Sequence, residues 1–132
     1  MRTYRYRLLR TSWGIWINLT ARAEAGELPG GVVVSPGLPV RLACVGSAAT
    51  LLEGEREELR RGLAAVAAGL PGPLTVIVSD VALVEVDFQP EGLAVAMCRW
   101  AEEEFGLTPR VIGESYDRAT NRYVFDWGAG DG

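Results

Sequence analysis

The chain has 132 residues and a net charge of −4, and apolar residues make up 48% of it. All thirteen basic side chains are arginines, and the sequence contains no lysine and no histidine. This composition excludes chemistry that needs an imidazole, a Schiff-base lysine or a P-loop ammonium, and it leaves carboxylates, hydroxyls, thiols and guanidinium groups.

Length and charge distribution favour a single domain over residues 1–127, with a disordered tail over residues 128–132. The composition is typical of a soluble globular protein, no apolar stretch is long enough to cross a membrane, and the amino terminus lacks a signal core. We therefore expect a cytoplasmic protein. Residues 1–52 carry a net charge of +4 and residues 53–132 one of −8, which argues against nucleic-acid binding over the whole surface but is compatible with a local basic face.

The first predicted elements are strands. Residues 4–10 alternate tyrosine with arginine, and residues 15–22 alternate aliphatic with polar side chains, a period of two that is typical of half-buried strands. A break over residues 11–14 joins them into a hairpin. Short strands are expected over residues 32–34 and 40–45, because the prolines between them forbid one continuous ladder.

A first helix is predicted after residue 50. Residues 50–53 match a capping box in which Thr50 is the N-cap and Glu53 reaches back to its amide. Gly69 and the prolines that follow end the helix. Its buried stripe is expected to contain Leu52, Leu59, Leu63, Val66 and Leu70.

The carboxy-terminal half is predicted to add strand, helix and hairpin. Residues 74–88 form a β-rich run that bends near Ser79 and Asp80 or divides into two strands. A second helix opens at Pro90 and ends at Gly106, with a stripe of Leu93, Met97, Trp100 and Ala101. Residues 111–116 and 123–127 flank a polar loop and predict a hairpin.

This order of elements predicts an α+β fold. We expect a two-layer sandwich, in which two helices pack on one face of a mostly antiparallel or mixed sheet with amino- and carboxy-terminal hairpins.

Residues 56–105 resemble domain IV of the elongation-factor-G-like translational GTPases. The similarity rests on Gly62-Leu63-Ala64, the glycine- and proline-rich turn over 69–73, the valine strand over 76–78, Val86-Asp87 and the alanine-rich helix from Glu91. The resemblance implies the ribosomal protein S5 domain 2-like fold and a protein associated with RNA or the ribosome. Where that family has a Gly-x-x-His type tip, this chain has acidic and apolar residues over 80–85, which are unfavourable beside phosphates, so the ribosomal role does not transfer directly.

Four carboxylates are the candidates for catalysis: Asp80, Glu85, Asp87 and Glu91. Glu85 and Asp87 lie two residues apart on a predicted strand and therefore share a face. Such a cluster could hold a hard cation or supply an acid and a base. The spacing matches no metal motif, so no metal and no cofactor is expected, and a solvated strand face is the alternative interpretation.

Arginines near the amino terminus form the candidate binding surface. Arg5, Arg7 and Arg10, with Trp16 nearby, combine guanidinium and aromatic groups as in surfaces that bind carboxylates, phosphates or single-stranded nucleic acid. The alternative is an exposed edge strand whose charge discourages strand addition.

Three acids end the second helix, where they oppose the helix macrodipole. We expect Glu102 and Glu104 either to meet the basic amino-terminal strand, within the chain or across a dimer, or to form a solvent-screened patch. Cys44 and Cys98 are expected to be reduced, buried thiols. Cys98 is not expected to act as a nucleophile, because the chain has no histidine to activate it.

These patterns favour a small binding domain without catalytic activity, whose partner is another protein or an anionic ligand. A homodimer is compatible with the sequence, whereas nucleic acid is less favoured. A carboxylate-based enzyme and an RNA-associated accessory protein are the alternatives.

Overall fold

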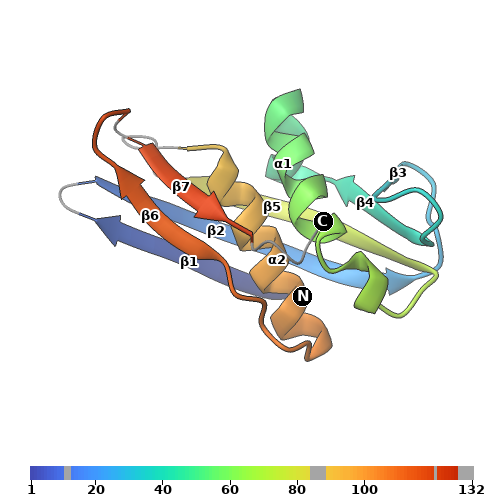
Figure 1. Cartoon of the computed structure of the whole chain (residues 1–132). Coiled ribbons are helices and arrows are strands. Elements are labelled where there is room, and N and C mark those ends of the chain that lie inside the picture. Colours follow the sequence, from blue (N-terminus) through green and yellow to red (C-terminus); the bar gives the residue numbers. More distant parts are fainter. Residues whose placement is uncertain (11–12, 84–88, 121, 128–132) are drawn as a thin grey trace.

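A mixed β-sheet is the framework of the structure, a computed structural model that describes residues 1–10, 13–83, 89–120 and 122–127 and gives the backbone alone for residues 9, 10 and 13 (Figure 1). Within these residues five strands pair in the order β1-β2-β5-β4-β3. All neighbouring strands are antiparallel except β4 and β5, which are parallel. The strands are β1 (Arg2–Arg10), β2 (Trp13–Ala25), β3 (Val32–Val33), β4 (Val40–Cys44) and β5 (Leu74–Leu83).

The amino-terminal hairpin confirms the alternation in the sequence. Strands β1 and β2 pair without a break from Arg2 opposite Ala21 to Arg10 opposite Trp13. The face that carries Tyr6, Leu8, Ile15, Ile17 and Leu19 is buried. Arg5 and Arg7, at the alternate positions of β1, therefore lie on the other face of the sheet, whereas Arg2 lies on the helix side against Glu104.

Strand β5 bends where the sequence predicts it. The register between β2 and β5 shifts at this point, because Val78 pairs with Ala21 but Asp80 pairs with Thr20, which leaves Ser79 as an extra residue. A 3₁₀ turn, η1 (Gly46–Thr50), lies against the bulge. A Cβ atom at Gly46 would lie 2.5 Å from the carbonyl oxygen of Ser79, so only glycine allows this approach.

Helix α1 (Glu53–Ala64) begins later than predicted, because residues 46–50 are already committed to the 3₁₀ turn. The Thr50 hydroxyl donates to the Ser47 carbonyl at 2.7 Å and does not cap the helix. The amide of Leu52 donates instead to the carboxylate of Glu55 at 2.8 Å. Leu52 is 71% exposed, so its predicted burial is wrong.

The rest of the α1 stripe divides between the helix and the chain after it. Leu59 and Leu63 are buried on α1 as expected. The helix ends before Gly69, and a second 3₁₀ turn, η2 (Ala67–Gly69), leads to the buried Leu70.

Helix α2 (Glu91–Phe105) has the predicted ends. Pro90 precedes its first turn, and Gly106 adopts a left-handed conformation with φ of 64°. The amide of Leu107 then donates to the carbonyl of Glu102 at 2.9 Å, which closes the helix as a Schellman motif does.

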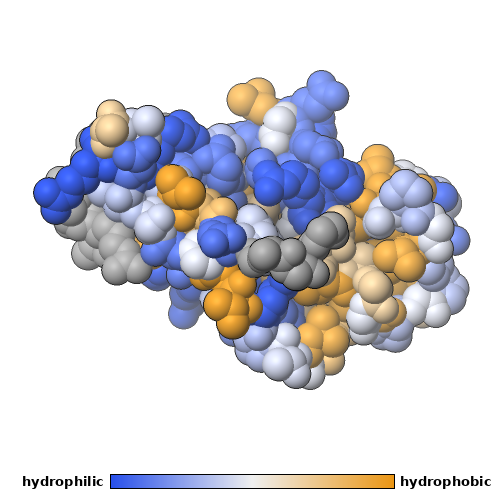
Figure 2. Space-filling model, in the orientation of Figure 1, coloured by the Kyte–Doolittle hydropathy of each residue, from blue (hydrophilic) through white to orange (hydrophobic). Residues whose placement is uncertain are grey.

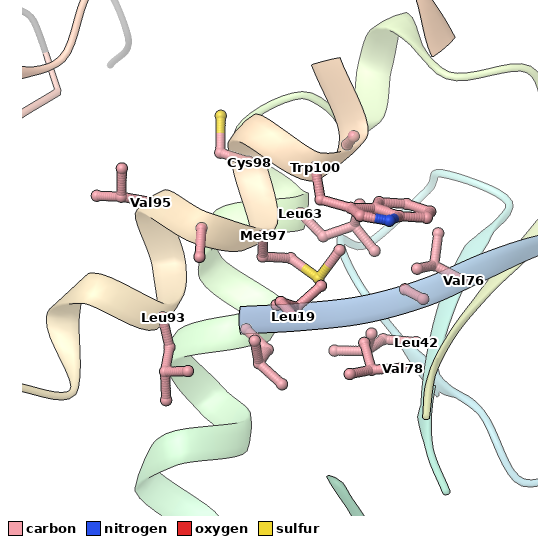
Figure 3. Close-up of a cluster of buried hydrophobic side chains, with 14 of the residues drawn as sticks. Leu19, Leu42, Leu63, Val76, Val78, Leu93, Val95, Met97, Cys98 and Trp100 are labelled. Atoms are coloured by element: carbon pink, nitrogen blue, oxygen red, sulfur yellow. The ribbon is translucent and has the colours of Figure 1, made fainter. Parts of the chain in front are cut away.

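The hydrophobic core lies between α2, α1 and one face of the sheet. Figure 3 shows Met97 and Trp100 pointing from α2 towards Leu19 and Val76, with Leu63 of α1 beside them. Cys98 points to the other side of the helix and is also buried. The long run of buried residues in α2 follows from its central place among α1, the sheet and the carboxy-terminal hairpin.

That hairpin, β6 (Gly113–Asp117) with β7 (Arg122–Asp126), forms a separate two-stranded sheet on the helix side (Figure 1). The buried side chain of Gln89 holds it, because its amide oxygen accepts from the Tyr123 N–H at 2.8 Å and its amide nitrogen donates to the Tyr123 carbonyl at 2.6 Å. The hydroxyl of Tyr6 in β1 donates to the carboxylate of Glu114 in β6. The result is the predicted α+β arrangement, with the hairpin added to the helix layer.

Figure 2 shows this covered side of the molecule, with hydrophilic side chains over α1 and hydrophobic surface towards β3 and β4. Val32 and Val33 of β3 are among the exposed apolar residues there. Of the helices in the described ranges, none is both long and apolar enough to cross a membrane. The tail predicted over residues 128–132 lies outside the described residues.

Candidate binding surface

The face of the sheet opposite the helices carries Arg5 and Arg7 of β1. Residues that pair directly across antiparallel strands point to the same face. Arg5 is opposite Asn18 and Arg7 is opposite Trp16, so these four side chains lie together on that face. We call them the β1–β2 basic face.

Arg7 and Trp16 are in direct contact there. The guanidinium carbon of Arg7 lies 4.6 Å from the centroid of the Trp16 ring, within cation–π range. The Nη2 atom of Arg7 donates to the Asn18 side chain at 2.8 Å, and Nη1 donates to the carbonyl oxygen of Tyr6 at 3.0 Å. Trp16 is 51% exposed. The guanidinium group is thus fixed in orientation on a surface that stays open to solvent.

A shallow hollow of about 70 Å³ adjoins this contact, lined by Arg7, Trp16, Asn18, Ala82 and Leu83. Its size suits a single small group rather than a whole ligand. A partner on this face would therefore place one side chain or one charged group beside Arg7.

The basic face has an excess of positive charge. Arg22 and Arg41 have acidic partners, since Arg22 pairs with Glu24 at 3.0 Å and Arg41 pairs with Glu27 at 3.3 Å. Among the described residues no carboxylate pairs with Arg5 or Arg7. The side chain of Arg10, the third predicted arginine, lies outside the described residues.

The start of β5 is covered on the same face. Residues 26–31 fold over the start of β5, where the Leu28 amide donates to the Thr75 hydroxyl at 2.9 Å and that hydroxyl donates to the Gly26 carbonyl at 2.7 Å. Thr75 is fully buried as a result, and Ile77 is 6% exposed. The β1–β2 hairpin and the end of β5, where Asp80 and Ala82 are exposed, stay open on this face.

The candidate catalytic carboxylates have separate partners. Asp80 accepts a hydrogen bond from Ser47 of η1, whereas Glu91 accepts from Arg122 at 2.6 Å and from Gln89 at 2.7 Å beside the hairpin. Glu85 and Asp87 lie outside the described residues. In the ranges that the structure covers, no three Cys, Asp or Glu side chains are grouped to hold a metal ion.

The acids at the end of α2 meet the amino-terminal strand within the chain. Glu104 pairs with Nε of Arg2 at 2.9 Å, and Glu103 lies 3.7 Å from Nη1 of the same residue. Of the two alternatives that the sequence left open, Glu103 and Glu104 follow the first, and their contact with the amino-terminal strand is intramolecular. Glu102 differs: it is buried and binds Nη1 of Arg99 at 2.8 Å and the backbone amide of Arg110 at 2.7 Å.

The two thiols are far from activated. Burial raises the pKa of Cys98 to about 12, and the nearby Glu102 carboxylate adds to the shift. Burial also raises the pKa of Cys44. Cys44 lines a cavity of about 750 Å³ between α1 and β4, together with Val32, Leu42 and Arg56. Glu53 and Glu57 also line this cavity, and the Cys44 thiol, with its raised pKa, ionises less readily than a free thiol.

A second cavity, of about 590 Å³, lies between β1 and the end of α2, and we call it the β1 edge cavity. Its lining residues are Tyr4, Arg99, Glu102, Glu103, Gly106, Leu107, Pro109, Arg110 and Val111. No sequence pattern predicts this cavity, because its walls come from three segments that only the tertiary structure brings together. Asn18 was also missed, although a fixed hairpin register would have placed it opposite Arg5.

Comparison with known proteins adds no assignment: no family model, curated protein or solved structure matches the chain. The interpretation of the site therefore rests on its geometry.

Proposed function

We propose that this protein is a non-catalytic binding domain that holds an anionic group of a protein partner on the β1–β2 basic face. The observation that carries the proposal is the Arg7 guanidinium, stacked on the half-exposed ring of Trp16 without a carboxylate partner among the described residues. A guanidinium group binds a carboxylate through two parallel hydrogen bonds. Arg5, two residues away on the same face, adds a second positive charge.

Preorganisation supports this proposal. A free arginine loses rotamer freedom when it binds, and immobilising such a side chain costs about 0.5–1.5 kcal/mol. Asn18 and the Tyr6 carbonyl already restrain Arg7. A partner that pairs with Arg7 therefore loses less binding free energy to side-chain ordering than one that pairs with an unrestrained arginine.

The alternatives have weaker support. A carboxylate enzyme would need an acid and a base that act on one substrate, whereas Asp80 and Glu91 are bound to different elements. An RNA-associated role remains a prediction from the resemblance to translation-factor domain IV. It would use the same arginines, with phosphates in place of carboxylates.

Titration with two anionic probes tests the proposal. A hexaglutamate peptide and a thymidine hexanucleotide would be added at low salt, where the Debye length exceeds about 10 Å, while Trp16 fluorescence and arginine Nε–H resonances are recorded. We expect hexaglutamate to bind, the double variant Arg5→Ala/Arg7→Ala to lose binding, and added salt to weaken it.

The matched control is Arg22→Ala, because Arg22 lies on the same face of the sheet, is partly exposed and is paired with Glu24. This variant should bind as the wild-type protein does. Equal binding by the double variant, or no binding of either probe at low salt, would refute the proposal. Clear preference for the oligonucleotide would favour the RNA-associated alternative.

A further inference from the structure

Strand β1 is an edge of the sheet. In the described part of the chain it pairs with β2 on one side only. It is nine residues long, and every second residue of an edge strand directs its N–H and C=O outward. Such a row of backbone groups is a template on which another extended segment can pair.

The two sides of this edge differ in charge. On the open side lie Arg5 and Arg7 of the β1–β2 basic face. On the helix side positive and negative charges are paired with each other: Arg2 with Glu103 and Glu104, and Arg99 with Glu102. An added strand would therefore be favoured if its acidic side chains faced the open side and uncharged ones faced the helices.

The β1 edge cavity lies on the helix side of the same strand. Tyr4 is the β1 residue in its wall, and Leu107, Pro109 and Val111 provide apolar surface. Its described lining contains no residue of β2, so the cavity opens on the unpaired side of β1. Val111 is 86% exposed, which leaves apolar surface at the mouth. A segment paired with β1 would place an inward-facing side chain here.

We propose that β1 binds an extended segment of a partner protein as an additional strand, and that acidic and apolar residues alternate in this segment. The acidic side chains of the added strand lie beside Arg5 and Arg7 on the open face. An apolar side chain on its other face enters the β1 edge cavity next to Tyr4. The proposal rests on the proposed function, because the same two arginines supply the charge. It adds the backbone pairing and the cavity.

Charge also decides against a second copy of the chain as the occupant. Two β1 strands paired with each other would bring Arg5 and Arg7 of one copy close to those of the other. Like charges on neighbouring strands destabilise the pairing. The arginines that disfavour self-association thus favour an acidic strand.

Backbone methylation tests strand addition directly. The probe is a capped heptapeptide that alternates valine and glutamate, Val-Glu-Val-Glu-Val-Glu-Val, and two derivatives carry N-methyl groups on the odd-numbered or the even-numbered residues. Only one set of amides can face β1, so one derivative should lose about tenfold or more in affinity while the other binds nearly as the parent does. If the two derivatives have equal affinity, tight or absent, strand addition is wrong.

Two further probes separate this proposal from the proposed function. A scrambled peptide of the same composition and hexaglutamate both keep negative charge without the alternation. If they bind as tightly as the alternating peptide, anion binding on the basic face stands and strand addition fails. If no peptide binds at low salt, both proposals fail.

The cavity has its own variant. Val111→Asn changes an exposed residue and should fold, and it places a polar amide at the cavity mouth without changing the net charge, so it should weaken the alternating peptide at least severalfold but leave hexaglutamate unaffected. If the variant lowers the affinity for both peptides equally, or lowers neither affinity, the cavity takes no part in binding the peptide. Formation of a dimer that the alternating peptide fails to dissociate would overturn the choice of occupant.

Discussion

Gly62 of α1 packs directly against the backbone carbonyl of Ala94 in α2, so closely that a Cβ atom at residue 62 would lie 2.0 Å from the Ala94 oxygen. The two helices thus meet at backbone distance. Close approach lets Leu59 and Leu63 of α1 and Leu93 of α2 share one fully buried cluster above the sheet.

Gly62→Ala should destabilise the protein strongly. The new methyl group must push the helices apart, and overpacking of this kind costs about 1–3 kcal/mol or more. Gly54→Ala, in the same helix, is the matched control because a Cβ there meets nothing within 4 Å. It should be neutral or stabilise by up to about 1 kcal/mol. Urea denaturation of both variants measures the difference, and similar midpoints would contradict the close packing.

Gln89→Ala should loosen the carboxy-terminal hairpin. The substitution removes the amide that pairs with both backbone groups of Tyr123 in a buried position, at a cost of about 2–4 kcal/mol. Amide hydrogen exchange should then accelerate in β6 and β7 more than in β2. Arg122→Ala removes only a surface ion pair with Glu91 and should change stability by less than about 1 kcal/mol. Uniform exchange across the molecule would show that Gln89 is not the hairpin's anchor.

The thiols should differ in reactivity. In the native protein at pH 8, Cys98 should resist a disulfide reagent until the protein unfolds, and Cys44, which is partly exposed, should react first. Alanine or serine at each position identifies the thiol that reacts. Rapid labelling of Cys98 under native conditions would contradict its burial.

Alkaline pH should weaken the fold through Cys98. Its pKa is about 12 in the folded protein and near 9.0 when exposed, so above pH 9 the unfolded chain loses a proton that the folded chain keeps. The contribution to stability is complete below pH 9 and is lost as pH rises towards 12. The free energy of unfolding should therefore fall more steeply between pH 9 and 11 in the wild-type protein than in Cys98→Ala. Parallel curves would count against the shift.

Glu102→Gln should destabilise far more than Glu103→Gln. The Glu102 side chain is 3% exposed and pairs with Arg99, so its neutralisation leaves a partly buried guanidinium without its counter-charge, at a cost of about 3 kcal/mol. The Glu103 side chain is 51% exposed and its loss should cost less than about 0.5 kcal/mol. Thermal unfolding at low and high salt compares the two. If Glu102→Gln lowers stability only slightly and the loss depends on salt, Glu102 behaves as a surface ion pair and the prediction is wrong.

Local periodicity was enough to predict most elements. The alternation over residues 4–10 and 15–22 became β1 and β2, and Pro90 and Gly106 marked the ends of α2. These signals succeed because each depends on a few neighbouring residues. The cap at Thr50 failed because the competing turn begins at Gly46, outside the four-residue motif.

The contacts between distant segments could not be predicted from the sequence. Nothing local to Gly62 indicates that Ala94 will face it, and nothing near Gln89 indicates that its amide will pair with Tyr123 as a strand would. The Arg7–Trp16 stack lay closer to prediction, since both residues were candidates. What was missing was the hairpin register, because a break placed over residues 11–14 leaves several registers open.

Strand β5 lies between β2 and β4 in space but follows both in the chain. Until β5 has been synthesised, the hairpin β1–β2 and the pair β3–β4 each keep an unpaired inner edge, and no contact between them can close the sheet. During synthesis, β1–β2 and β3–β4 therefore leave the ribosome before β5, the strand that joins them. The pairings of β5 with β2 and β4 are non-local contacts, which form more slowly than local ones.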